Sequence, residues 1–237
     1  MGNDISPIVS ALRAAKAAIQ IPVFMKMSPH PNIQDIAKAV KNAGADGVVM
    51  INSFGPCMGI DVESGLPLMG SKEGYGWLSG AAIKPLAVRC VYDAAKVVKI
   101  PIFGVGGITN GRDVAEMFMA GASAVQVCTA GILKGPYVYG KIVKELEAFL
   151  DSHGYADVAE IKGLAHRRMT ERVFRTTADV PAVDQKHCNL CGLCETSCVY
   201  HAISCLGELV IDSGKCFGCG LCVTRCPKRA LTLPGQG

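Results

Sequence analysis

The sequence predicts an α/β fold of parallel strands joined by helices, followed by a smaller cysteine-rich domain. Short apolar runs alternate with amphipathic segments over the first two thirds of the 237 residues. Nine of the 12 cysteines then lie between Cys188 and Cys226. A hydrophobic fraction of 50% with 19% charged residues is typical of a globular protein with room for one large core or two domains.

Four runs have the short apolar pattern of parallel strands bounded by Gly or Pro: residues 22–27, 46–53, 101–106 and 124–129. Helical periodicity is found in residues 6–19, 32–44, 81–98, 111–121 and 137–154. The first helix has Ser6 as its predicted N-cap and Pro7 in its first turn. Alternation of this kind predicts crossover helices between parallel strands. Four such strands form either a small open sheet or half of an eight-stranded barrel.

Composition also excludes several classes of protein. The N-terminus lacks the basic start and apolar block of a signal peptide, and no apolar run reaches 18 residues. We therefore expect a cytoplasmic protein without a membrane partner. The net charge of +4 is small and scattered, so it gives no basis for nucleic-acid binding.

The cysteines form an internal repeat. The segments "CNLCGLCETSC" from Cys188 and "CFGCGLCVTRC" from Cys216 share the pattern C-x-x-C-G-L-C-x-T-x-C. In such runs three cysteines hold one [4Fe-4S] cluster and the fourth reaches the other cluster. The predicted ligand sets are Cys188, Cys191, Cys194 and Cys226 for cluster one, and Cys216, Cys219, Cys222 and Cys198 for cluster two. Two four-cysteine zinc sites are the alternative, but two complete runs in tandem exceed what zinc requires.

Residues outside the repeats complete this domain outline. Cys205 belongs to neither run, so we interpret it as a small buried thiol. Residues 167–184 are charged and rich in turn formers, which predicts a linker between a domain over 1–166 and a second domain over 185–237.

Polar residues and glycines gather where the predicted strands end, which is where parallel α/β folds place their chemistry. They are Lys26, Asn52, Ser53, Gly106, Gly107, Cys128 and Thr129. An ammonium in the middle of an apolar strand is costly to bury, so Lys26 is expected to face an anion or acceptors, the alternative being a lysine that extends to solvent. "GVGG" followed by a helix, together with "CTAG", favours a phosphate site over a plain tight turn.

Five segments carry a family resemblance: "IPVFMKMSP", "GADGVVMINSF", "GWLSGAAIKPLAVR", "IPIFGVGGI" and "GASAVQVCTA". In this order they resemble the second half of the FMN-binding TIM barrel of the dihydroorotate dehydrogenase family. With the attached module, which resembles a bacterial two-cluster ferredoxin, the order most resembles dihydropyrimidine dehydrogenase and its bacterial iron-sulfur subunit. The resemblance implies that 1–166 is an FMN-binding half-barrel and 185–237 a two-[4Fe-4S] ferredoxin domain.

The resemblance also implies residue roles. Lys26 would lie beside the flavin N1 and C2 carbonyl and stabilise the reduced anion. The ribityl phosphate would be held by Gly80, Val105, Gly106, Gly107, Cys128 and Thr129. Asn52 and Ser53 would face the substrate ring, unless Asn52 is only a hydrogen-bonded turn residue.

Part of that family's barrel has no counterpart in the sequence. Its first four strands and its general acid or base loop precede the matching region, so the catalytic residue is unknown. Met1 is then either an internal methionine of a longer reading frame or the start of a split enzyme. Half a barrel leaves strand edges and an apolar face open, so we expect a partner chain or self-association to complete it.

The resulting functional prediction is an oxidoreductase subunit or fragment. Electrons would pass between the clusters and FMN to reduce or oxidise a C=C bond of a small dihydropyrimidine- or dihydroorotate-like substrate. "GVGGITNG" lacks the G-x-G-x-x-G spacing of a dinucleotide site, so a separate NAD(P)H-dependent flavoprotein or a ferredoxin would be the redox partner. The rival is a noncatalytic ferredoxin-type electron carrier whose barrel portion is a docking scaffold.

Overall fold

The structure is a computed structural model that describes residues 5–171 and 178–234, and the chain divides into two compact units, Met1–Glu171 and Arg172–Gly237. None of the helices in the described ranges has the length and apolar character needed to span a lipid bilayer.

The first unit is built on a four-stranded parallel sheet with the order β1-β2-β5-β6. Its strands are β1 (Phe24–Met27), β2 (Gly47–Met50), β5 (Ile102–Val105) and β6 (Ala124–Gln126). The helices around it are α1 (Ser6–Ala18), α2 (Ile33–Asn42), α3 (Lys84–Val97) after the 3-10 turn η1 (Ala81–Ile83), α4 (Gly111–Ala120) and α6 (Tyr137–Ser152). The predicted parallel strands and these helices are confirmed.

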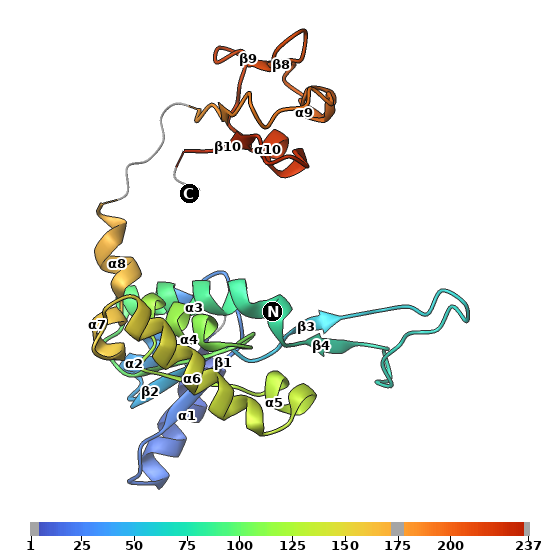
Figure 1. The fold of residues 1–237 in the computed structure, drawn as a ribbon. Coiled ribbons are helices and arrows are strands. Elements are labelled where there is room, and N and C mark those ends of the chain that lie inside the picture. The colour runs from blue at the N-terminus through green and yellow to red at the C-terminus, as the bar shows by residue number, and fades with distance from the viewer. Residues whose placement is uncertain (1–4, 172–177, 235–237) are drawn as a thin grey trace. The chain divides into compact units, whose positions relative to one another are not determined.

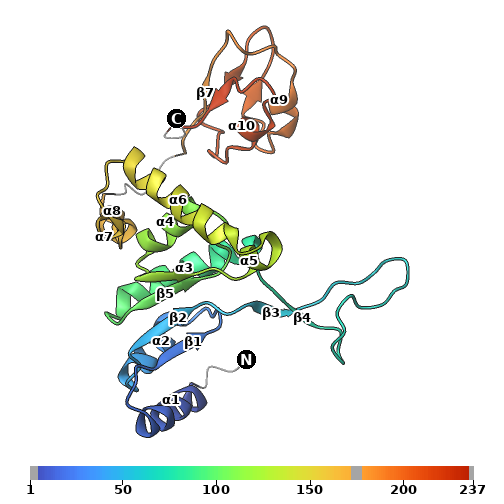
Figure 2. The same ribbon diagram turned by 60° about the horizontal axis from the view of Figure 1, so that its bottom comes forward.

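One face of the sheet is covered by the helices. The strand residues Met27, Val48, Met50 and Ile102 share one buried core with helix residues that recur every three or four positions. Those helix residues include Ile33, Ala37 and Val40 of α2, Ala87 and Val91 of α3, and Val114 and Met117 of α4. Helix α4 packs in turn against α6 (Figure 2).

The other face of the sheet is only partly filled. Because side chains alternate along a strand, the register places Phe24, Lys26, Val49 and Phe103 on this face. The Phe24 ring lies over Gly47, where a Cβ would clash with it, and its centroid is 4.9 Å from that of Phe103. The amino end of the face therefore carries an aromatic layer.

Lys26 differs from its prediction. It lies on β1, which pairs only with β2 among the described residues, and the side chain is exposed rather than buried. The expected burial needed a neighbouring strand on the other side of β1.

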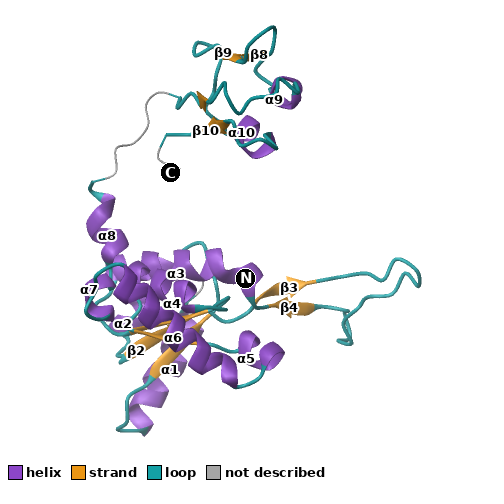
Figure 3. Ribbon diagram, viewed as in Figure 1, coloured by secondary structure: helices purple, strands orange, loops and turns teal. Residues whose placement is uncertain are grey.

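A long hairpin arm, residues 54–78, follows β2 and was not predicted. Strands β3 (Phe54–Cys57) and β4 (Gly76–Leu78) pair antiparallel at its base, and the rest projects from the sheet (Figures 1 and 3). Its exposed apolar side chains are Phe54, Met58, Ile60, Val62, Leu66, Leu68, Met69, Tyr75, Trp77 and Leu78. So many exposed apolar groups are typical of a surface that contacts another protein segment.

Three short helices of the first unit were also not predicted: α5 (Thr129–Lys134), α7 (Val158–Ile161) and α8 (Leu164–Met169). Helix α8 extends into the predicted linker. The predicted N-cap of α1 is wrong by one residue, because Ile5 occupies that position and Ser6 is already helical.

The second unit contains two short antiparallel pairs and two short helices. β7 (Ala182–Val183) pairs with β10 (Leu231–Thr232), and β8 (Ile203–Ser204) pairs with β9 (Val210–Ile211). Helices α9 (Leu193–Ser197) and α10 (Leu221–Arg225) lie one in each cysteine repeat. The end of the predicted linker therefore forms β7, and its residues 172–177 lie outside the described residues.

The aromatic layer gives a test of the sheet. We expect Gly47→Ala to lower the free energy of unfolding by about 1–3 kcal/mol, because the new methyl group must displace the Phe24 ring. Gly140→Ala in α6 is the control, because a Cβ there meets nothing within 4 Å. It should raise stability by about 0.5–1 kcal/mol through helix propensity. Urea denaturation followed by circular dichroism measures both, and equal effects would contradict the packing described.

Candidate cofactor sites

The sequence-predicted residues of the first unit come together at the carboxyl edge of the sheet. Lys26 lies late on β1, Asn52 and Ser53 follow β2, Gly106 and Gly107 follow β5, and Cys128 and Thr129 follow β6. Backbone hydrogen bonds hold these strand ends in register. The Asn52 N–H donates to the Met27 carbonyl at 2.7 Å and the Ile51 N–H to the Val105 carbonyl at 2.7 Å. The Asn52 side chain is left exposed.

Lys26 lies on the edge strand β1, and Cys128 follows the opposite edge strand, β6. Desolvation lowers the pKa of Lys26, and the neighbouring Cys128 opposes that shift. Lys26 therefore places a cation on the face of the sheet that carries Phe24 and Phe103, here called the open face.

The turn after β5 has no room for side chains. Gly107 has φ of 76°, and a Cβ there would lie 2.8 Å from the Lys84 backbone nitrogen. Gly106 has φ of 125°, and its Cβ would lie 2.9 Å from the Cβ of Ala87. Among the residues that the structure describes, the N–H groups of these two glycines donate no hydrogen bond. They are free to bind an anion.

Gly80 and Thr129 were predicted from separate segments, and the structure brings them together. Gly80 has φ of 78°, and a Cβ there would lie 3.1 Å from the Thr129 Cγ2. The Thr129 hydroxyl donates to the Ser79 hydroxyl at 3.1 Å. Ser79 was missed by sequence reasoning, although it directly precedes Gly80. Two hydroxyl groups therefore lie where the starts of η1 and α5 meet.

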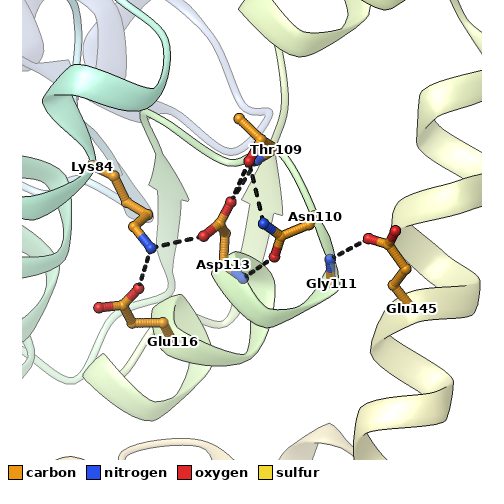
Figure 4. Close-up of polar contacts among 7 residues, drawn as sticks. All are labelled: Lys84, Thr109, Asn110, Gly111, Asp113, Glu116 and Glu145. Carbon is orange, nitrogen blue, oxygen red and sulfur yellow. Dashed lines mark hydrogen bonds and ion pairs between the residues drawn. The ribbon is translucent and has the colours of Figure 1, made fainter. Parts of the chain in front are cut away.

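A charged network lies behind the glycine turn (Figure 4). The Lys84 ammonium contacts Asp113 Oδ1 at 2.7 Å and Glu116 Oε2 at 2.8 Å. The other oxygen of Asp113 accepts hydrogen bonds from the Thr109 N–H and hydroxyl, both at 2.8 Å. Asp113 is buried. This network ties the turn between β5 and α4 to the start of α3, and sequence reasoning missed it because its members are far apart in the chain.

The network sets the protonation of its members. The hydrogen bonds to Asp113 and then to Glu116 raise the pKa of Lys84. Burial disfavours the charged form of Asp113, but hydrogen bonds from Lys84 and Thr109 outweigh burial and hold the pKa of this carboxyl below its ordinary value. The network is therefore an ion pair at neutral pH.

The N-terminus of α4 is already capped. The Asn110 Oδ1 accepts from the Asp113 N–H at 3.0 Å, and the Glu145 carboxylate accepts from the Gly111 N–H at 2.9 Å (Figure 4). The Gly111 and Asp113 N–H groups are therefore not free to bind an anion, whereas those of the glycine turn are.

In the second unit the cysteines line two separate cavities. One is lined by Cys188, Cys191, Cys194 and Cys226, and the other by Cys198, Cys216, Cys219 and Cys222. The fourth cysteine of each run thus lies with the three of the other run, as in the predicted ligand sets. Backbone N–H groups also meet the sulfurs. Ala202 donates to Cys198 Sγ at 3.4 Å, and its counterpart Ala230 donates to Cys226 Sγ at 3.3 Å.

The two cysteine repeats also have similar backbone conformations at corresponding positions. Gly192 and Gly220 have φ of 74° and 75° at the starts of α9 and α10. Leu190 has φ of 54° where the second repeat has Gly218 with φ of 72°. A Cβ on Gly218 would lie 2.9 Å from the Asp179 backbone nitrogen, so only the second repeat needs glycine there.

Cys205 lies against the first cavity. Its sulfur is 3.9 Å from that of Cys194, which is buried. Desolvation, with the neighbouring Cys194 second, raises the pKa of Cys205 to about 11, so it stays a thiol at neutral pH. The side chain is half-buried, somewhat less enclosed than predicted.

Comparison with known proteins shows which family the first unit matches. Residues 3–150 match the family described as dihydroorotate dehydrogenase. The chain belongs to the dihydroorotate dehydrogenase family. Membership in this family implies a TIM-barrel domain, and four parallel strands with helices on one face agree with it. Residues 209–232, which contain the second cysteine repeat, match the 4Fe-4S binding domain.

Relatives in this family include three proteins named dihydroorotate dehydrogenase B (NAD(+)), catalytic subunit. The one from Methanothermobacter thermautotrophicus is 43% identical over 167 residues, 70% of this chain and 54% of the relative. That from Methanosarcina mazei is 45% identical over 70% of this chain and 52% of the relative. That from Anoxybacillus flavithermus is 46% identical over 64% of this chain and 47% of the relative. The chain spans about half the length of these curated relatives.

The buried ion pair gives a pH-dependent prediction. We expect Asp113→Asn to lower the free energy of unfolding by about 2 kcal/mol at neutral pH, because it leaves Lys84 without its buried partner. A carboxyl with a lowered folded pKa stabilises the protein above its unfolded pKa, and that contribution is lost as pH falls. The difference between variant and wild type should therefore shrink below about pH 4.

The matched control is Glu116→Gln, because Glu116 is a more exposed partner of the same ammonium and should cost only about 0.5 kcal/mol. Denaturant titrations at a series of pH values measure both variants. A cost for Asp113→Asn that stays constant in acid would contradict the ionic role.

Proposed function

We propose that the chain is the iron-sulfur flavoprotein part of an oxidoreductase that moves electrons between two [4Fe-4S] clusters and FMN. The observation that carries this proposal is the presence, in one chain, of two four-cysteine cavities and of two unpaired glycine N–H groups at the carboxyl edge of a dihydroorotate dehydrogenase-family sheet.

The two cavities support clusters rather than single metal ions. Within the described ranges, no three His, Cys, Asp or Glu side chains converge on one point that could hold an ion. Four thiols that line a cavity without meeting at a point suit a cubane, because its corners keep the ligand sulfurs apart. Two complete C-x-x-C-x-x-C-x-x-x-C runs in tandem also exceed what a zinc site requires. The N–H donors to Cys198 and Cys226 also fit thiolate ligands.

The carboxyl edge of the sheet supports FMN. The free N–H groups of Gly106 and Gly107, with Gly80, Val105, Cys128 and Thr129 around them, would hold the phosphate end. Lys26 on the open face of the sheet would supply a positive charge near the ring. FMN, when bound, exchanges electrons singly or in pairs, which makes it a suitable link between one-electron clusters and a two-electron substrate.

The substrate is proposed to be a small ring with a C=C bond conjugated to a carbonyl, of the dihydropyrimidine or dihydroorotate type. Asn52 and Ser53 would bind it, because they extend beyond β2 at the same edge as Lys26, and the Asn52 side chain is exposed. An amide side chain can both donate to and accept from an amide edge. No general acid or base is assigned in this chain.

Completion of the barrel is part of the proposal. Among the described residues β1 and β6 each pair on one side only, and the open face of the sheet is only partly filled. A partner chain or a second copy is proposed to cover these edges. The electron partner is proposed to be an NAD(P)H-dependent flavoprotein or a ferredoxin, because the relatives named above are NAD(+)-type catalytic subunits. The rival function is a noncatalytic electron carrier, which would hold iron but no flavin.

Removal of one predicted ligand tests the cluster assignment. We expect Cys219→Ala to lower the iron content from about eight to about four per chain, because only the cavity that contains Cys219 loses a ligand. Cys57→Ala is the control, since Cys57 belongs to β3 of the first unit and lines neither cavity. Iron analysis and electron paramagnetic resonance of anaerobically prepared protein measure the result. Eight irons in Cys219→Ala would contradict the assignment.

Lys26 provides the test of the flavin site. We expect Lys26→Met to lower the flavin midpoint potential by roughly 30 mV, the two-electron equivalent of about 1.4 kcal/mol, because a cation near the ring favours the reduced anion. Lys38→Met on α2 removes the same charge at a site exposed to solvent and should leave the potential unchanged. Spectroelectrochemistry of the flavin decides between these outcomes. Equal shifts in the two variants would place Lys26 outside the flavin site.

A further inference from the structure

The two cysteine repeats share their spacing, but the residue that follows the short strand after each repeat differs between them. The repeats are offset by 28 residues, so β8 (Ile203–Ser204) corresponds to β10 (Leu231–Thr232). The residue after β8 is Cys205, and the residue after β10 is Leu233. The two positions are structurally equivalent.

Both side chains point at the start of the short helix that carries the third cysteine. Cys205 Sγ lies 3.9 Å from the sulfur of Cys194, which lines the first cavity. In the second repeat, Leu233 Cδ1 would lie 2.9 Å from a Cβ on Gly220, two residues before Cys222. A thiol therefore occupies in one repeat the place that a hydrocarbon group occupies in the other.

The direction of the sulfur contact follows from metal binding. A cysteine that binds a metal is a thiolate, which accepts hydrogen bonds and has no proton to donate. If Cys194 holds a cluster, as the proposed function requires, Cys205 is the donor. A hydrogen bond to a ligand sulfur favours the reduced cluster, which carries one more negative charge. Burial of Cys194 and half-burial of Cys205 strengthen that preference.

We propose that Cys205 is a positioning residue that donates its S–H to Cys194 and raises the reduction potential of cluster one above that of cluster two. Cys205 is not a ligand in this assignment. The first electron to enter the module would then reside on the cluster held by Cys188, Cys191, Cys194 and Cys226.

The test is a redox titration of the full, anaerobically loaded chain, followed by electron paramagnetic resonance. The signal missing in Cys219→Ala identifies cluster two. We expect Cys205→Ala to keep all its iron and to shift the reduced-to-oxidised ratio of cluster one about tenfold toward oxidised at a fixed potential, equivalent to about 59 mV for one electron. Cys205→Ser keeps a donor and should restore most of the shift.

Leu233→Ala is the matched control, because it removes side-chain volume at the equivalent position without touching a hydrogen bond. It should leave the potential of cluster one unchanged. The proposal is overturned if Cys205→Ala keeps its iron and the wild-type potential, or if Cys205→Ala and Cys205→Ser shift it equally. Loss of about four irons in Cys205→Ala would overturn it by making Cys205 a ligand. Wild-type protein without two clusters would instead refute the proposed function on which this inference rests.

Discussion

The approach of the β5 turn to the first residue of α3 is the contact on which the barrel unit depends. Gly107 lies so close to the Lys84 backbone that no side chain fits, and the Lys84 side chain reaches Asp113 on α4. One residue thus joins the end of a strand to two helices. The same contact holds the unpaired N–H groups of Gly106 and Gly107 at the carboxyl edge of the sheet. The packing of this turn and the proposed binding of the cofactor phosphate therefore depend on the same two glycines.

The second unit depends on duplication. Residues with positive φ at matching positions of the two repeats turn each loop, so that four sulfurs line each cavity. The last cysteine of each run lines the cavity of the other run. Such an exchange ties the repeats together, because neither cavity is complete without both. Duplication alone would make two equal sites. The difference between Cys205 and Leu233 breaks that equality and gives electron flow a preferred direction.

The spacing of apolar residues predicted the sheet and its main helices, and the spacing of the cysteines predicted which four of them line each cavity. The hairpin arm escaped prediction because Phe54–Cys57 includes Gly55 and Pro56 and its side chains are largely exposed, so no burial periodicity marks it. The Lys84 and Asp113 pair joins residues 29 apart and depends on how two helices pack. Lys26 is exposed because β1 is an edge strand among the described residues, and the order of strands in a sheet is not encoded in local sequence pattern.

The proposed function requires one chain to combine a flavin site with two clusters, so the decisive measurement is the amount of FMN and of iron in a single anaerobically purified sample. We expect about eight irons and one FMN per chain, in an assembly larger than the monomer that completes the sheet. About eight irons without flavin would contradict it and favour the electron-carrier function.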